Sequence, residues 1–205
     1  MLYERRHMFS NLSSRIGEFF AQAGISPNRW TLITFIPVAL TMLFILQQAF
    51  LIASAFFILA AFIDMIDGAV ARATSAVSRL GAYLDTIIDR YVEFLVLVPL
   101  ILIPMPGVFL PFAFWLFVYL FGSMMTTYAK SAAKEKGIIS AYEELKGGLL
   151  ERAERLVILF IGLLLAGIFG TIWLTYVVVI LAVLSNVSAI QRMAKAFLRA
   201  NSLMF

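Results

Sequence analysis

The segment LIASAFFILAAFIDMIDGAVARATSAVSRLGAYLDTIIDRYVEFLVLVPLILI, residues 51–103, contains two long apolar stretches that are separated by a short polar turn. A helix needs about 20 mostly apolar residues to cross a hydrocarbon core of about 30 Å, and residues 51–73 and 79–103 both reach this length. Because only a short stretch from Ala73 to Ser78 joins them, we expect two antiparallel neighbouring helices. The segment therefore predicts a pair of membrane-spanning helices.

The rest of the chain has the same character. Of its 205 residues, 62% are hydrophobic and only 14% are charged, whereas a soluble domain is about half apolar and about a quarter charged. We therefore predict an all-α polytopic membrane protein that forms a single membrane domain over residues 1–205, with a six-helix bundle over 28–194. The six expected transmembrane helices are 28–48, 51–73, 79–103, 108–134, 149–168 and 171–194.

An amphipathic helix is expected before the first span, over residues 8–24. Its apolar side chains recur on one helical stripe, which is typical of a helix lying flat at the membrane interface; they are Met8, Leu12, Ile16, Phe19 and Phe20. Gly24 ends this helix, and Ser26-Pro27 starts the next one. The first 25 residues lack an apolar core and a small-residue cleavage site, so we expect no cleavable signal peptide.

The basic residues predict the orientation. With six spans, nearly all of them lie on the same side as both termini, namely Arg5, Arg6, Arg15, Arg29, Arg72, Arg79, Lys130, Lys134, Lys136, Lys146, Arg152, Arg155, Arg192, Lys195 and Arg199. Arg90, inside the third span, is the exception, and the opposite loops carry no charge. Since basic residues stay in the cytoplasm, we predict a multi-pass protein of the cell membrane with both termini cytoplasmic.

The residue types restrict the chemistry. There are no cysteines, which excludes disulfides, thiolate metal sites and cysteine nucleophiles. The one histidine, His7, lies close to the N-terminus, which argues against a histidine-based metal or acid–base centre. Carboxylates, basic groups and hydroxyls must carry any reaction.

Four aspartates stand out: Asp64 and Asp67 near the end of the second span, and Asp85 and Asp89 near the start of the third. Ionisable residues inside spans are costly and indicate function. Four close carboxylates need a counter-charge to stay ionised, and all-oxygen ligation suits Mg²⁺, Mn²⁺ or Ca²⁺. A proton or ion pathway, and structural pairing with Arg72, Arg79 and Arg90, are the alternatives.

Small and polar residues share the faces that carry these aspartates. On the first helix, Gly68, Ala71 and Arg72 follow Asp64 and Asp67 at helical spacing, and on the next helix Ser78 and Gly81 share the face of Asp85 and Asp89. Glycines there would let a ligand or a backbone approach closely. Close helix packing is the alternative explanation for each glycine.

The arrangement Asp64-x2-Asp67-Gly68-x2-Ala71-Arg72-x8-Gly81-x3-Asp85-x3-Asp89 resembles the signature of the CDP-alcohol phosphotransferases. Every fixed position of that signature is occupied. The likeness extends more loosely to the amphipathic N-terminal helix, the six spans, and the start of the first span at Ser26-Pro27-Asn28-x2-Thr31.

The resemblance implies a role for each residue. Asp64, Asp67 and Asp85 would bind two divalent metal ions, either Mg²⁺ or Mn²⁺. Asp89 would complete the metal site and act as the general base. A pocket for the CDP-linked lipid would be lined by Asn28, Thr31, Gly68, Ala71, Arg72, Thr74, Ser78 and Gly81. The metal would neutralise the pyrophosphate, and the base would deprotonate the acceptor hydroxyl. The family alone implies a homodimer.

A second, cationic group lies downstream. Tyr128-Ala129-Lys130 ends the fourth span, Gly147-Gly148-x3-Arg152-x2-Arg155 begins the fifth, and Arg192 ends the sixth. Guanidinium groups suit bidentate phosphate binding. Such cations at helix ends also serve as anchors or anionic-lipid contacts, and Glu151 and Glu154 could pair with neighbouring arginines.

This cationic stretch looks like the subgroup of phosphatidylinositol phosphate and archaetidylinositol phosphate synthases, although Ala153 stands where relatives often have proline. The resemblance implies that Lys130, Arg152, Arg155 and Arg192 bind the phosphate of inositol 1-phosphate. The expected reaction transfers a phosphatidyl or archaetidyl group to an inositol phosphate hydroxyl and releases CMP. Glycerol 3-phosphate and other alcohols remain alternative acceptors. The tails of the CDP-linked lipid are either acyl esters or isoprenoid ethers.

Two other classes of protein are alternatives to the expected enzyme. A cation transporter could use the aspartates as an ion path, but such sites lie near the bilayer midplane between repeats. Here the acids gather toward one end of the spans, and no repeat of the motif is visible. A non-catalytic scaffold would not explain four acids with glycines on the same faces.

Overall fold

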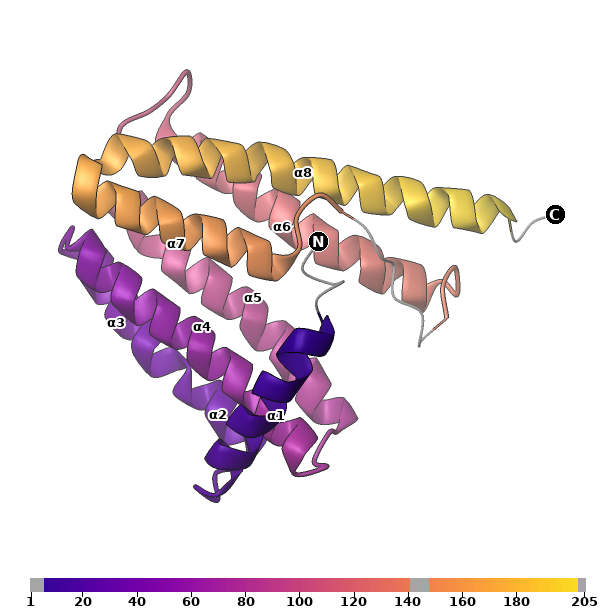
Figure 1. Ribbon diagram of the computed structural model, residues 1–205. Helices are drawn as coiled ribbons and strands as arrows, with labels where there is room; N and C mark the ends of the chain where they lie inside the picture. Colours follow the sequence, from indigo (N-terminus) through magenta and orange to yellow (C-terminus); the bar gives the residue numbers. More distant parts are fainter. Residues whose placement is uncertain (1–5, 141–147, 203–205) are drawn as a thin grey trace. The chain divides into compact units, whose positions relative to one another are not determined.

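The computed structural model describes residues 6–140 and 148–202, with the backbone alone at 6–12 and 202. Arg5, Lys146 and Gly147, which entered the sequence argument, lie outside the described residues. The described part is all-helical, as predicted, apart from its turns and one isolated β-bridge between Val108 and Leu110 (Figure 1). In order, the helices are α1 (Arg6–Ala21), α2 (Pro27–Ile33), α3 (Phe35–Leu46), α4 (Phe50–Ala73), α5 (Arg79–Leu102), α6 (Phe112–Glu135), α7 (Arg152–Phe169) and α8 (Thr171–Ser202).

Helices α4 and α5 match their predicted ranges to within one residue at each end. The predicted first span is instead divided at Thr34 into α2 and α3. Pro37 has no N–H to donate to the carbonyl of Ile33, so the regular hydrogen-bond ladder is interrupted there. At the C-terminal end of the chain, α8 continues to Ser202, whereas the sixth span was predicted to stop at residue 194. The helix extends because Lys195 to Asn201 are mostly good helix formers.

Among the described residues, four helical segments are long and apolar enough to cross a membrane: Pro27–Leu46, Phe50–Ala73, Phe112–Glu135 and Thr171–Asn201. Two further predicted spans, α5 and α7, form as helices but carry more charge. Asp85, Asp89, Arg90 and Glu93 lie on α5, and α7 begins with Arg152, Glu154 and Arg155. The structure thus shows a protein with at least these four apolar helices.

The chain forms two compact units, Met1–Pro99 and Leu100–Phe205. In the first unit α4 is the central helix, and α1, α2 and α3 all pack against it (Figure 1). The buried core between α3 and α4 includes Val38, Ile45, Ala53 and Phe57. Asp64 and Asp67 therefore lie on the helix against which α1, α2 and α3 pack.

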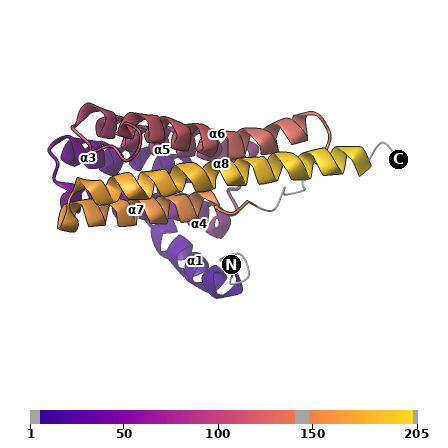
Figure 2. The same ribbon diagram turned by 90° about the horizontal axis from the view of Figure 1, so that it is seen from above.

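In the second unit α8 packs against both α6 and α7 (Figure 2). Gly122 permits the close approach of α6, because a β-carbon there would collide with Asn186 on α8. The amide nitrogen Nδ2 of Asn186 donates to the carbonyl of Val118 at 2.9 Å. Gly162 permits the close approach of α7 to α8, since a β-carbon at Gly162 would lie 2.9 Å from the Leu174 side chain. Small residues thus set the spacing of these three helices.

Candidate active site

A tight turn joins α4 to α5. At the end of α4 the Thr74 hydroxyl donates to the Val70 carbonyl at 2.8 Å, and Ser75 adopts a left-handed backbone with φ 53°. Ser78 then caps α5, because its Oγ accepts a hydrogen bond from the backbone N–H of Gly81 at 3.0 Å. This turn brings the C-terminal end of α4 against the N-terminal end of α5.

Three carboxylates meet at this junction. Asp64, Asp67 and Asp85 can each offer an oxygen atom such that the three atoms lie within 4.8 Å of one another. Asp67 is buried, Asp64 is half-buried and Asp85 is exposed. Three carboxylate oxygens form the hard, all-oxygen donor set that Mg²⁺ and Mn²⁺ prefer. The residues present therefore fit a divalent metal ion.

Thr31 on α2 fixes the most buried of these carboxylates. Its hydroxyl donates to Oδ2 of Asp67 at 2.6 Å, and both residues are 6% exposed. The Pro27 carbonyl lies 3.2 Å from the same hydroxyl. Sequence resemblance predicted Thr31 only as a residue that lines the CDP-lipid pocket, so its bond to a candidate metal ligand is new information from the structure.

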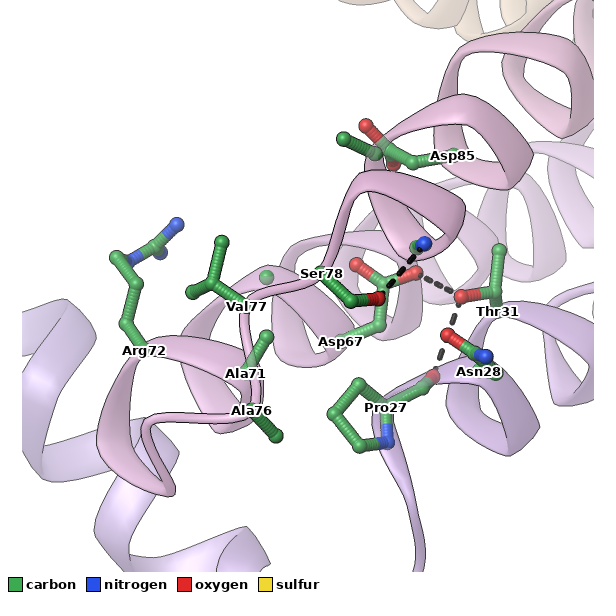
Figure 3. A pocket seen from close by; sticks show the side chains of 13 residues that line it. Pro27, Asn28, Thr31, Asp67, Ala71, Arg72, Ala76, Val77, Ser78 and Asp85 are labelled. Carbon is green, nitrogen blue, oxygen red and sulfur yellow. Dashed lines mark hydrogen bonds between the residues drawn. The ribbon is translucent and has the colours of Figure 1, made fainter.

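A cavity of about 340 Å³ opens beside the carboxylates (Figure 3). Arg72 and Thr31 lie at opposite ends of it in this view. Its lining includes seven of the eight residues expected around the CDP moiety together with two of the aspartates: Asn28, Thr31, Gly68, Ala71, Arg72, Ser78, Gly81, Asp67 and Asp85.

The two glycines of the motif lie where side chains would intrude. A β-carbon at Gly81 would lie 3.1 Å from Oγ of Ser78 and 3.4 Å from Oδ1 of Asn28. At Gly68 it would lie 3.2 Å from Nη1 of Arg72. The contacts with Ser78 and Arg72 are tighter than ordinary van der Waals distance, so glycine leaves room at the cavity wall and lets the Arg72 guanidinium lie over α4.

Two predicted site residues lie apart from these groups. Thr74 does not line the cavity, and its hydroxyl serves the end of α4. Asp89 lies one turn beyond Asp85 on α5, half-buried, and is not one of the three clustered carboxylates. The assigned roles of both residues stay predictions.

Two arginines near the aspartates, Arg72 and Arg90, have partners outside the group of four aspartates. Nη1 of Arg90 forms an ion pair with Oε2 of Glu93 at 2.7 Å, and the Glu93 side chain is almost fully buried. Nη2 of Arg72 donates to Oγ of Ser13 on α1 at 2.8 Å. Sequence reasoning missed both partners. Glu93 could have been found as an ionisable residue within an apolar helix, whereas the Ser13 contact joins residues far apart in the chain.

The predicted acceptor residues belong to the second unit, where Thr126 of α6 links two of them. Arg155 is 1% exposed, and its Nη1 lies 3.4 Å from Oγ1 of Thr126. Nη1 of Arg192 donates to the Thr126 backbone carbonyl at 2.9 Å. Lys130 lies one turn after Thr126 on α6. Cations from α6, α7 and α8 are therefore organised around one threonine that the sequence argument did not single out.

The start of α7 is built by local contacts. Glu151 and Glu154 form a reciprocal capping box, in which the Glu151 N–H donates to Oε2 of Glu154 at 3.0 Å. Before it, the N–H of Leu150 donates to Oγ of Ser188 on α8 at 2.9 Å. The two glutamates thus serve as helix caps, an arrangement that the sequence argument did not consider, and they hold the turn of α7 that carries Arg152 and Arg155.

The sequence profile of the family described as CDP-alcohol phosphatidyltransferase matches residues 25–191. The chain belongs to this family. The aspartate motif, the cavity beside it and most of the cationic group lie within the matched range. Together with the apolar helices, family membership identifies the chain as a membrane enzyme that belongs to the CDP-alcohol phosphotransferases.

Several family members are similar over nearly the whole chain. The archaetidylinositol phosphate synthase of Pyrococcus horikoshii is 33% identical over 96% of both chains. The phosphatidylinositol phosphate synthase of Mycobacteroides abscessus is 31% identical over 92% of this chain and 84% of its own.

Solved structures show the same fold. The phosphatidylinositol phosphate synthase of Mycobacterium tuberculosis is 25% identical with a TM-score of 0.78, both in complex with manganese and citrate and with CDP-DAG bound. These alignments cover 90% and 91% of this chain, and 88% and 94% of the solved chains.

Proposed function

We propose that this family member transfers a phosphatidyl or archaetidyl group from a CDP-linked lipid to a hydroxyl of inositol 1-phosphate, releasing CMP. One observation carries the proposal. Asp67 and Asp85 belong both to the three-carboxylate cluster and to the wall of the cavity that Arg72, Gly68 and Gly81 line. A divalent-metal site and a cavity suited to a pyrophosphate thus share two residues.

The cavity chemistry suits a nucleoside diphosphate. The Arg72 guanidinium at one end offers several N–H donors to phosphate oxygens, and Asn28 offers an amide for a nucleobase or ribose. Asp64, Asp67 and Asp85 would hold Mg²⁺ or Mn²⁺, and Asp89 would complete the metal site. The family resemblance implies two ions. Bound there, the metal would neutralise the pyrophosphate and the charge that develops on the leaving CMP.

Asp89 is proposed as the general base. The acceptor hydroxyl oxygen forms a bond to the phosphorus that carries the lipid, and the bond from that phosphorus to the CMP oxygen breaks. The proton of the hydroxyl passes to the Asp89 carboxylate, and CMP leaves as the anion. A base one helical turn from the three clustered carboxylates can act on the acceptor while they remain bound to metal.

The acceptor is proposed to bring its own phosphate. Lys130, Arg152, Arg155 and Arg192 would bind it, and the Thr126 contacts with Arg155 and Arg192 support a common orientation of the cations. The similar proteins of Pyrococcus horikoshii and Mycobacteroides abscessus are an archaetidylinositol phosphate synthase and a phosphatidylinositol phosphate synthase, which supports this choice of acceptor.

We also propose the arrangement in the membrane. All of 28–194 would form one six-helix domain in a homodimer, α5 and α7 would cross the bilayer, and both termini would be cytoplasmic. The family profile supports the single domain, because it runs through both compact units. α1 would lie at the interface, which its exposed Phe19, 68% accessible, supports.

An acceptor panel tests the proposal. Purified protein with a CDP-linked lipid and Mg²⁺ or Mn²⁺ is expected to release CMP with inositol 1-phosphate, and far less with inositol, glycerol 3-phosphate or serine. Each lipid, with acyl-ester or isoprenoid-ether tails, is tested in turn. Removal of the metal with a chelator is expected to stop the release, and added Mg²⁺ or Mn²⁺ to restore it.

Three results, one from this panel and two from separate assays of the Asp89→Asn variant and of ion transport, would contradict parts of the proposal. If inositol is used as well as its phosphate, Arg152 and Arg155 do not select the acceptor. If Asp89→Asn retains full transfer, Asp89 is not the base, because losing one lowers the rate by about 10²–10⁴-fold. Ion transport without any CMP release would favour a transporter instead.

A further inference from the structure

Helix α1 packs on α4 through a different face from the apolar stripe that the sequence predicts for membrane contact. Ser13, Gly17 and Phe20, spaced at i, i+4 and i+7, all have contacts within the first unit. Only Phe20 belongs to both faces. α1 is thus a packed part of this unit as well as a candidate interfacial helix.

Gly17 sets the distance between the two helices. It is buried, and a β-carbon there would overlap the backbone carbonyl oxygen of Ala69 and lie 3.0 Å from Cβ of Ala73. Only glycine allows this approach of α1 to the backbone of α4. The contact lies one turn from Arg72, so the position of α1 is fixed next to that residue.

Phe20 fixes the other end of the contact. Its ring makes edge-to-face contacts with Trp30 of α2, at a centroid distance of 5.4 Å, and with Phe62 of α4, at 6.3 Å. Such edge-to-face aromatic pairs stabilise a contact beyond the area that they bury. With Gly17 and Phe20 both held, α1 can neither slide along α4 nor rotate on it without losing one of these contacts.

This docking places the Ser13 hydroxyl against the cavity arginine. Nη2 of Arg72 donates to Oγ of Ser13 at 2.8 Å. Its other terminal nitrogen, Nη1, lies above Gly68, 3.2 Å from where a β-carbon would be. The guanidinium is therefore held between α1 on one side and the side-chain-free surface of α4 on the other.

We propose that Ser13 is a positioning residue for Arg72, and that α1 is docked on α4 in order to hold this arginine at the mouth of the cavity for the pyrophosphate of the CDP-linked lipid. The proposal rests on the proposed function of the cavity. An exposed arginine side chain samples many rotamers, and ordering it at the moment of binding lowers affinity. The Ser13 hydroxyl removes part of that loss before the ligand arrives.

The test compares Ser13→Ala with Ser13→Thr, which keeps the hydroxyl, and with Gln22→Ala, which alters an exposed polar residue directly after α1. Losing one hydrogen bond to a partly exposed charged group predicts an effect of about two- to tenfold. In Ser13→Ala, the rate at which phenylglyoxal modifies Arg72, followed by peptide mass spectrometry, is expected to rise by that factor. The KM for the CDP-linked lipid is expected to rise similarly at nearly unchanged kcat.

Ser13→Thr and Gln22→Ala are expected to match the unmodified protein in both measurements. The proposal is overturned if Ser13→Ala leaves Arg72 modification unchanged, or if Gln22→Ala changes it equally. A fall in kcat with an unchanged KM would also overturn it, because a general structural defect acts in that way. The modification rate needs no substrate, so it tests the contact even if the chain transfers no CDP-lipid, which separates this proposal from the proposed function.

Discussion

At the scale of single residues, Asp67 and Thr31 illustrate how a candidate metal ligand is held. Asp67 as a residue is 6% exposed, and its carboxylate accepts a 2.6 Å hydrogen bond from the Thr31 hydroxyl. A buried carboxylate without such a donor is costly, and its orientation is free to change. A partner that orients a metal ligand from behind contributes to affinity without touching the ion.

Thr31→Val is therefore expected to weaken metal binding. Valine keeps the shape of threonine but cannot donate to Asp67, and losing such an outer partner lowers metal affinity by about 10- to 100-fold. A titration of purified protein with Mn²⁺, followed by electron paramagnetic resonance, measures the change directly.

Thr34→Val is the matched control for this experiment. Thr34 is as buried as Thr31, but its hydroxyl donates to the backbone carbonyl of Trp30 on its own turn. If both variants lose equal Mn²⁺ affinity, the effect is one of general packing and the assigned role of Thr31 is wrong.

The aspartates and glycines of the site could be found from the sequence because their pattern is local. Asp64, Asp67 and Gly68 share one face of α4 by helical spacing alone, and all of them lie at the cluster or the cavity. The bond from Thr31 to Asp67 could not be found in this way. It joins residues 36 positions apart, and only the packing of α2 on α4 brings them together.

At the scale of helices, Thr126 organises the cationic group from the middle of α6. Its carbonyl accepts from Arg192 of α8, and its hydroxyl lies 3.4 Å from Nη1 of Arg155 of α7. The same hydroxyl donates to the carbonyl of Ser123 at 2.7 Å, which leaves its lone pairs free to face Arg155. The backbone carbonyl and the side-chain hydroxyl of one residue thus contact cations on two other helices.

Thr126→Val is expected to raise the KM for inositol 1-phosphate. The variant loses the hydroxyl near Arg155 and keeps the carbonyl bond to Arg192, so a change of about two- to tenfold is expected for one weak hydrogen bond. The KM for the CDP-linked lipid should not change. Steady-state kinetics with each substrate varied in turn measures both values.

The adjacent Thr127→Val provides the control, since Thr127 is half-buried on the same turn of α6. Equal effects of the two variants, or a larger change in the KM for the lipid than for the acceptor, would show that Thr126 does not act through Arg155.

At the scale of the whole molecule, the number of membrane crossings depends on α5 and α7. Four other helical segments are apolar enough to cross on composition alone. α5 is 24 residues long and α7 is 18, which corresponds to about 36 and 27 Å at 1.5 Å per residue. Both are long enough to span most of a hydrocarbon core of about 30 Å. The charges of α7 lie in its first turn, and α5 carries no charge after Glu93.

Single cysteines distinguish six crossings from four, and the chain has no cysteine of its own to interfere. With six, Gln48→Cys and Phe109→Cys are expected to react with a membrane-impermeant maleimide added outside cells, while Lys136→Cys is protected. All three positions are exposed loop or helix-end sites. If α5 and α7 do not cross, positions 48 and 136 would share one side and position 109 would lie on the other.

The sequence by itself determined the helical class, the α4–α5 pair to within a residue and the positions of the aspartates, because apolar length and helical period are local properties of the chain. The division of the first predicted span at Thr34 has a local cause too, because Pro37 lacks the N–H that would continue the hydrogen-bond ladder. Only the tertiary structure decided which hydroxyl holds Asp67, which threonine joins Arg155 to Arg192, and which serine meets Arg72. Those contacts depend on how closely helices approach at Gly17 and similar positions, and no pattern along a single helix encodes that distance.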